Sequence, residues 1–91
     1  MTKVEGTRKD HNVRIYALST CMWCRKTKKL FEENSVEYEF EDVDLLQGEE
    51  RESMVTQVRQ HNPNASFPTI LVDDRVIVGY KEDELKEALG L

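Results

Sequence analysis

The chain has 91 residues, of which 38% are hydrophobic and 34% charged, so it has room for one soluble globular domain and no second one. No apolar run is long enough to cross a bilayer, and the first twelve residues lack the apolar segment of a secretory signal. The net charge of −5 is divided unevenly. Residues 1–30 carry eight Lys and Arg against two Asp and Glu, and residues 31–91 carry five against sixteen. This asymmetry either orients a protein partner or reflects ordinary solvated faces, and an acidic chain without aromatics among its basic residues is not expected to bind nucleic acid.

The N-terminal residues are polar and predict a loose tail over residues 1–12, which leaves residues 13–91 as the folded domain. Residues 13–18 alternate and then run apolar, which is typical of a largely buried strand. The tail and the first strand are therefore expected to meet at residue 13.

A helix is predicted directly after this strand. Ser19 and Thr20 supply side-chain oxygens suited to an N-terminal cap, and the helix begins at Cys21 or Met22. It ends at residues 34–35, where Asn and Ser interrupt the apolar period.

The remaining elements follow from their patterns. Strict alternation over 36–43 indicates a strand, and a second helix is expected from about 46 to 60. The β-rich runs 69–72 and 75–78 predict a hairpin, and 82–89 predicts a closing helix. The order β-α-β-α-β-β-α indicates an α/β fold with a four-stranded mixed sheet flanked by three helices, in which the first two strands are parallel.

The only two cysteines form the segment Cys21-Met22-Trp23-Cys24 at the predicted strand-to-helix junction. Residues three apart at a helix start lie within the distance that a disulfide requires. A ring this short stabilises a fold by only about 2 kcal/mol, so the pair is better suited to a reversible switch than to a staple. Two cysteines are too few for a disulfide scaffold, and a reducing cytoplasmic compartment is predicted.

The position of the two thiols divides the chemistry between them. Cys21 faces the unpaired N–H groups and the positive dipole end of the helix, which favour a thiolate, whereas Cys24 points inward and keeps its proton. We expect Cys21 to attack a disulfide and Cys24 to resolve the mixed disulfide. Four basic residues that follow make the local potential more positive: Arg25, Lys26, Lys28 and Lys29.

The alternative to redox chemistry is a metal site, because a Cys-x-x-Cys segment is also half of a zinc site. No second such segment exists, and the only histidines are His11 and His61. A related alternative is an iron–sulfur module in which Cys21 of two protomers shares a cluster.

Three blocks of the sequence resemble glutaredoxin-like proteins: IYALSTCMWC (15–24), SFPT (66–69) and GYKED (79–83). Their order and spacing match, and the similarity covers residues 13 to about 90. The resemblance implies a thioredoxin/glutaredoxin-like fold for the mixed sheet. It also implies that Pro68 follows a cis peptide bond and lies beside the cysteine pair.

The resemblance further implies a substrate-binding surface around the thiols. The exposed backbone of Phe67 would pair with an extended substrate segment, and Tyr80 either lines this surface or packs the last helix on the sheet. The substrate-binding residues expected from it are Met22, Trp23, Phe67, Pro68, Thr69, Gly79 and Tyr80.

Two positions bear on the choice of reductant. Glutathione-using members typically carry a cation where this chain has Leu18, and a Gly-Gly pair where it has Val78-Gly79. The 79–83 block is instead similar to NrdH-type redoxins, which pass electrons to ribonucleotide reductase and are reduced by a flavoprotein of the thioredoxin-reductase kind. We therefore expect a monomeric carrier that reduces protein disulfides, with a redox-active disulfide and no bound cofactor or metal. The alternative is a glutathione-dependent glutaredoxin.

Overall fold

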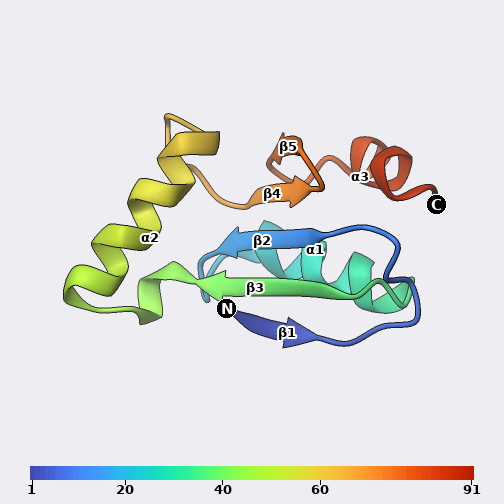
Figure 1. The fold of residues 1–91 in the computed structure, drawn as a ribbon, viewed down its shortest axis with the longest axis horizontal. Coiled ribbons are helices and arrows are strands. Elements are labelled where there is room, and N and C mark those ends of the chain that lie inside the picture. Colours follow the sequence, from blue (N-terminus) through green and yellow to red (C-terminus); the bar gives the residue numbers. More distant parts are fainter.

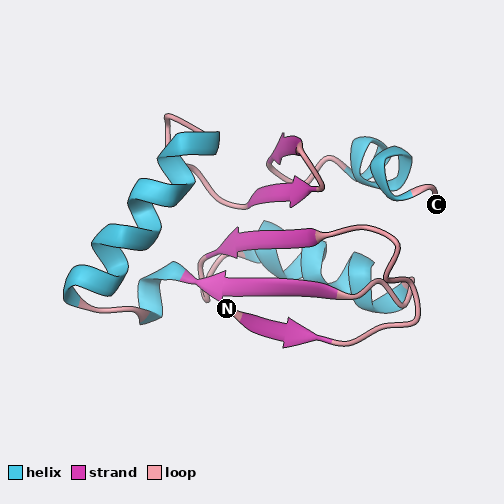
Figure 2. Cartoon of the chain, in the orientation of Figure 1, coloured by secondary structure: helices cyan, strands magenta, loops and turns pink.

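A computed structural model describes residues 1–91 and shows a mixed five-stranded sheet with the strand order β1-β3-β2-β4-β5 (Figure 1). The strands are β1 (Thr2–Val4), β2 (Val13–Ala17), β3 (Tyr38–Asp42), β4 (Thr69–Val72) and β5 (Arg75–Val78). Three α-helices and one short 3-10 helix connect them: α1 (Met22–Glu33), η1 (Val43–Leu45), α2 (Gly48–His61) and α3 (Glu82–Leu89) (Figure 2).

The central strand is β2, which pairs in parallel with β3 and antiparallel with β4. Ile15 lies opposite Phe40 of β3 and Ile70 of β4, and Ile70 lies opposite Ile77 of β5. Because side chains alternate along a strand, this register places a row of large apolar groups on one face of the sheet. That row is the surface on which α1 and α3 pack.

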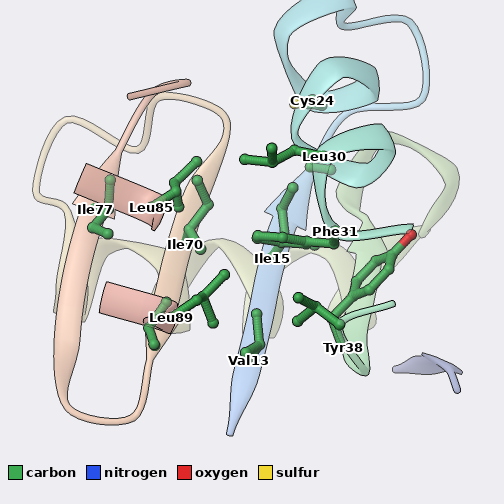
Figure 3. Close-up of a cluster of buried hydrophobic side chains, with 13 residues drawn as sticks. Val13, Ile15, Cys24, Leu30, Phe31, Tyr38, Ile70, Ile77, Leu85 and Leu89 are labelled. Atoms are coloured by element: carbon green, nitrogen blue, oxygen red, sulfur yellow. The ribbon is translucent and has the colours of Figure 1, made fainter. Parts of the chain in front are cut away.

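Helices cover both faces of the sheet. Figure 3 shows side chains of α1 and α3 packed around Ile15 and Ile70, and all of them are buried: Leu30, Phe31, Leu85 and Leu89. On the opposite face, Val58 of α2 packs with Tyr16 and Leu71 in a smaller cluster. The two clusters hold the sheet between helices, and no helix of the chain combines the length and apolar character needed to cross a bilayer.

The predicted mixed sheet flanked by three helices is confirmed, with five strands in place of four, and the segment predicted as a tail over residues 1–12 contributes the additional strand. Thr2–Val4 form β1, which pairs antiparallel with β3 and makes a fifth strand at the edge of the sheet. Farther along, the Arg8 N–H donates to the Ser35 carbonyl and the Glu37 N–H donates to the Arg8 carbonyl, each at 2.9 Å. Backbone hydrogen bonds of this kind require no apolar pattern, which is why the composition of the segment did not indicate them.

One glycine allows the N-terminal segment to lie close to the end of α1. A Cβ atom on Gly6 would collide with the backbone carbonyl of Ser35, so a larger residue would force the two segments apart.

From residue 13 onward the predicted order of elements is confirmed. The hairpin and the last helix have the predicted bounds, and α1 begins at Met22. The strand predicted over 36–43 is shorter in the structure, where β3 begins at Tyr38. It ends at Asp42 because residues 43–45 form η1, and α2 begins at Gly48.

Candidate active site

The first cysteine lies at the junction between β2 and α1. The connecting loop turns at Leu18, whose carbonyl oxygen accepts a hydrogen bond from the Cys21 N–H at 3.1 Å. Cys21 has an extended backbone and is the N-terminal cap of α1, and its Sγ accepts the N–H of Cys24 at 3.2 Å. Sulfur thus occupies the position of the oxygen that usually caps a helix. The capping role predicted for Ser19 and Thr20 is wrong.

The second cysteine points inward from the first turn of α1. Its side chain is 0% exposed and belongs to the core cluster that contains Leu30 and Ile15 (Figure 3). The pKa of the Cys24 thiol is raised to about 12, first by burial and then by the hydrogen bond and charge of Cys21. A hydrogen bond with the Leu18 backbone and the charge of the Lys28 ammonium lower it by less. Cys21, which is only partly buried, is the thiol that solvent reaches.

The basic side chains of α1 do not all contribute free positive charge. Lys28 Nζ lies 3.0 Å from Asp42 Oδ1, so the paired carboxylate offsets its charge. Arg25 Nη2 donates to the Ser19 carbonyl at 3.2 Å, which ties the loop before Cys21 to the helix after it. Arg25 is exposed, as are Lys26 and Lys29.

An aromatic stack borders the cysteine pair. Trp23 is 51% exposed and stacks on Tyr80, with ring centroids 5.9 Å apart and planes 21° apart. Lys26 Nζ lies 4.8 Å from the centre of the Trp23 ring, and Met22 is 62% exposed beside it. The sequence did not indicate this stack, because Trp23 and Tyr80 are far apart in the chain and no periodic pattern links them.

The segment before β4 contains the proline expected beside the cysteine pair. The Phe67–Pro68 peptide bond is cis, as the family resemblance implies. Phe67 is partly buried against both core clusters, whereas Pro68 is fully buried and its carbonyl accepts the Gly79 N–H at 2.8 Å. Phe67, Tyr80 and Cys21 all pack against the core cluster that contains Cys24.

Thr69 lies at the start of β4 with its side chain turned inward. Its hydroxyl is buried, donates to the Ser66 carbonyl at 2.7 Å and accepts from Asn62 Nδ2 at 3.1 Å. The Thr69 side chain therefore points into the fold and binds neighbouring loop residues.

A carboxylate that the sequence did not indicate holds the loop before Cys21. Asp44 of η1 accepts the Ser19 N–H at 2.8 Å through Oδ1 and the Ser19 hydroxyl through Oδ2. Arg51 of α2 donates to the Asp44 carbonyl at 2.7 Å. No local pattern indicates such a contact, because Asp44 lies 25 residues after Ser19.

The histidines considered as metal ligands lie in separate places. His11 Nδ1 lies 2.7 Å from Asp73 Oδ2, and His61 stacks on Tyr16 with ring centroids 6.5 Å apart. No group of three or more His, Cys, Asp and Glu side chains is arranged to hold a metal ion.

The mixed sheet and a Cys-x-x-Cys pair at the start of α1 define a thioredoxin-fold dithiol protein. The family model described as Glutaredoxin matches residues 13–77. A glutaredoxin-like 8.6 kDa protein in the rubredoxin operon of Clostridium pasteurianum is 31% identical over 78 residues, which cover 85% of this chain and 96% of that protein.

Two solved structures from Methanosarcina are also similar. The methanoredoxin of Methanosarcina acetivorans has a TM-score of 0.93 and 43% identity, over 100% of this chain and 97% of that one. The glutaredoxin of Methanosarcina mazei Go1 has a TM-score of 0.88 and 45% identity, over 99% and 87%.

The chain belongs to the glutaredoxin family. Proteins of this family are thiol–disulfide oxidoreductases that use redox-active cysteines without a tightly bound cofactor. They act on disulfide substrates and are themselves reduced by a reductase.

Proposed function

We propose that this protein is a dithiol electron carrier that reduces protein disulfides through Cys21 and Cys24. One observation carries the proposal. A partly exposed sulfur caps α1 and accepts a hydrogen bond from the N–H of a fully buried cysteine one turn later. This arrangement supplies one thiol to attack and a second to release the product.

In the first step the Cys21 thiolate attacks one sulfur of the substrate disulfide. A bond forms between Cys21 Sγ and that sulfur, the substrate S–S bond breaks, and the other substrate sulfur leaves as a thiolate. The Cys24 N–H and the N-terminal end of α1 stabilise the negative charge on Cys21 before the attack.

In the second step Cys24 attacks Cys21 Sγ and breaks the mixed disulfide. Cys24 loses its proton, and the second substrate sulfur leaves as a thiolate and takes up a proton from solvent. The substrate gains two electrons, and the carrier is oxidised to a Cys21–Cys24 disulfide. Because the hydrogen bond and charge of Cys21 help to raise the Cys24 pKa, their loss in the mixed disulfide lowers that pKa when deprotonation is needed.

The surface around Cys21 supports a protein as substrate. Met22 and Trp23 place exposed apolar area beside the thiol, with Tyr80 behind Trp23. None of the hydrogen bonds within the chain uses the backbone N–H or C=O of Phe67. An extended substrate segment would pair with these two groups.

The partners are those that the sequence resemblance implies. We propose that ribonucleotide reductase is one acceptor of the electrons, as for NrdH-type redoxins. A flavoprotein of the thioredoxin-reductase kind would recharge Cys21 and Cys24, in a reducing cytoplasm.

Replacing Cys24 tests the proposal directly. The Cys24→Ser variant lacks the resolving thiol, so we expect it to remain bound to a disulfide substrate as a mixed disulfide through Cys21. Peptide mapping after trapping in cell extract, followed by release with dithiothreitol, would identify both the attached sulfur and the partner.

The matched controls are the Cys21→Ser variant and the double variant. Neither is expected to form the adduct, because Cys24 is buried and protonated. An adduct on Cys24 in the Cys21→Ser variant at the same rate would show that the roles are wrongly assigned.

A glutathione-dependent glutaredoxin is the second candidate, and one feature favours it. A hollow of about 360 Å³ beside Tyr80 is lined by Lys26 and Lys29, which suit the carboxylates of glutathione, and also by Glu33 and Glu82, which suit its ammonium group. A coupled assay with glutathione and glutathione reductase, run beside a thioredoxin-reductase system on the same disulfide, separates the two. Faster turnover with glutathione would reverse the ranking.

A further inference from the structure

The loop that carries Cys21 is flanked by a segment far from it in sequence. Because β2 and β3 are parallel, the segments that follow their carboxyl ends lie at the same edge of the sheet (Figure 1). The loop of residues 18–21 follows β2, and η1 follows β3. The side chain of Asp44 in η1 contacts this loop.

Both oxygens of the Asp44 carboxylate bind the same loop residue. Oδ1 accepts the Ser19 N–H at 2.8 Å, and Oδ2 accepts the Ser19 hydroxyl. These two hydrogen bonds lower the pKa of Asp44, so the carboxylate is ionised at neutral pH and accepts both donors. Arg51 anchors η1 in turn, because it donates from α2 to the Asp44 carbonyl.

The other hydrogen bonds of this loop are formed within it or with the first turn of α1. The Cys21 N–H closes the turn on the Leu18 carbonyl, the Cys24 and Arg25 N–H groups bind Cys21, and the exposed Arg25 side chain donates to the Ser19 carbonyl at 3.2 Å. Ser19 lies two residues before Cys21, so the placement of Ser19 constrains where the Cys21 sulfur lies relative to the first turn of α1.

We propose that Asp44 is a positioning residue for the nucleophile: it holds Ser19, and through the loop it keeps Cys21 Sγ within hydrogen-bond distance of the Cys24 N–H. This role rests on the proposed function of Cys21 as the attacking thiol. Asp44 does not touch the reacting sulfur and acts only through the loop.

Two substitutions at Asp44 separate position from charge. Asp44→Asn keeps an oxygen for the Ser19 N–H and an amide that donates to the Ser19 hydroxyl, but it removes the charge. Asp44→Ala removes both contacts. Asp73→Ala is the matched control, because Asp73 also accepts one backbone N–H and one side-chain donor, from Asn12 and His11, next to the opposite end of β2.

The experiment measures alkylation of Cys21 by iodoacetamide in the reduced full-length protein, with the modified residue identified by mass spectrometry. We expect Asp44→Ala to slow alkylation by about tenfold, and Asp44→Asn to stay within about twofold of the wild type. Asp73→Ala is expected to leave the rate unchanged even if it lowers the melting temperature as much as Asp44→Ala does. Hydrogen exchange of the Cys24 N–H should accelerate in Asp44→Ala alone.

Three results would overturn the proposal. A wild-type rate in Asp44→Ala would show that the loop needs no support. Slowing in Asp73→Ala that equals the slowing in Asp44→Ala would show a loss of general stability. Slowing in Asp44→Asn as large as in Asp44→Ala would show that charge, and not position, is the cause.

If Asp44→Ala does not fold, Ser19→Ala takes its place, since it removes only the hydroxyl contact. We expect Ser19→Ala to slow alkylation by about threefold, and an unchanged rate would overturn the proposal. Alkylation needs only a reactive Cys21, so its outcome does not depend on whether the protein reduces protein disulfides. Failure of disulfide reduction by the wild type would instead count against the proposed function.

Discussion

Cys21 and Cys24 differ in environment although they are separated by one helical turn. The cap position leaves Cys21 partly exposed with a backbone N–H on its sulfur, and the first turn of α1 rotates Cys24 into the core. The difference in reactivity thus follows from the place of each residue in the helix.

Alkylation should therefore be selective. With a pKa of about 12, only about one Cys24 side chain in ten thousand is a thiolate at pH 8, and burial also blocks access to the sulfur. We expect one adduct per native molecule, on Cys21, and two adducts after denaturation in guanidinium.

The count of adducts by intact-mass spectrometry checks this prediction. The Cys21→Ser variant should gain no adduct under native conditions in the same time. A native molecule that acquires both adducts at similar rates would contradict it.

At the scale of elements, a buried polar side chain holds the loop that connects α2 to β4. Asn62 follows the last turn of α2 and is 5% exposed, and its Nδ2 lies within hydrogen-bond distance of three acceptors: the Ser66 carbonyl, the Ser66 hydroxyl and the Thr69 hydroxyl. Its Oδ1 accepts the Asn64 N–H at 3.3 Å. This network fixes the segment that leads from α2 to Phe67 and Pro68.

Replacing Asn62 should destabilise the fold more than replacing Asn64. Asn62→Ala leaves the Ser66 and Thr69 oxygens without their amide donor, and we expect a loss of about 1–3 kcal/mol in the free energy of unfolding. Urea denaturation followed by far-UV circular dichroism measures it.

The matched control is Asn64→Ala, because the exposed Asn64 contributes only its backbone N–H to the network. We expect this variant to change the free energy of unfolding by less than about 0.5 kcal/mol. Equal losses in the two variants would contradict the role of the Asn62 side chain.

Much of the fold could be predicted because most elements carry a local signal. The alternation in β2 and β3, the hairpin and the acidic first turn of α3 are all readable within a few residues. The redox role of the cysteine pair could be predicted in the same way, because the two cysteines are three residues apart and lie at the predicted start of a helix.

The parts that could not be predicted depend on long-range contacts between short polar segments. Asp44 lies beside Ser19 only because β2 and β3 are parallel neighbours, and Trp23 meets Tyr80 only when α3 has packed on the sheet. The end of the second helix near residue 60 could be predicted, but the acceptors of Asn62 lie in a loop that has no periodic pattern. The sequence alone contains no signal of which donor such a residue will meet.

At the scale of the whole molecule, a histidine joins the N-terminal segment to the hairpin of β4 and β5. His11 Nδ1 lies 2.7 Å from Asp73 Oδ2, and Asp73 Oδ1 accepts the Asn12 N–H at 2.8 Å. The hydrogen bond to Asp73 raises the pKa of His11, and the same bond lowers the pKa of Asp73. Stability should depend on pH through this pair.

The directions of the two pKa shifts determine the pH range in which the pair stabilises the fold. The raised His11 pKa gives stability that is complete below about pH 6.5 and is lost as the pH rises through the folded value. The lowered Asp73 pKa gives stability that is present above about pH 3.8 and is lost as the pH falls through its folded value. The pair therefore stabilises the fold most between about pH 4 and pH 6.

Removing the His11 side chain should lower the stability of the fold mainly between about pH 4 and pH 6. We expect His11→Ala to lower the melting temperature at pH 5.5 and to have a clearly smaller effect at pH 9, measured by circular dichroism in the same buffer series. His61→Ala is the control, since His61 stacks on Tyr16 and forms no ion pair with a carboxylate, and its effect should be the same at both pH values. An equal effect of His11→Ala at both pH values would exclude the charged pair.

The N-terminal strand β1 also forms one edge of the sheet. Without β1, the hydrogen-bonding groups along one side of β3 would be open to pairing with an extended segment of another molecule. β1 occupies that side with only three residues and carries an exposed lysine at its centre, and short charged borders of this kind resist edge-to-edge association. A segment remote from the thiols thus protects this edge of the sheet against pairing with a neighbouring copy of the protein.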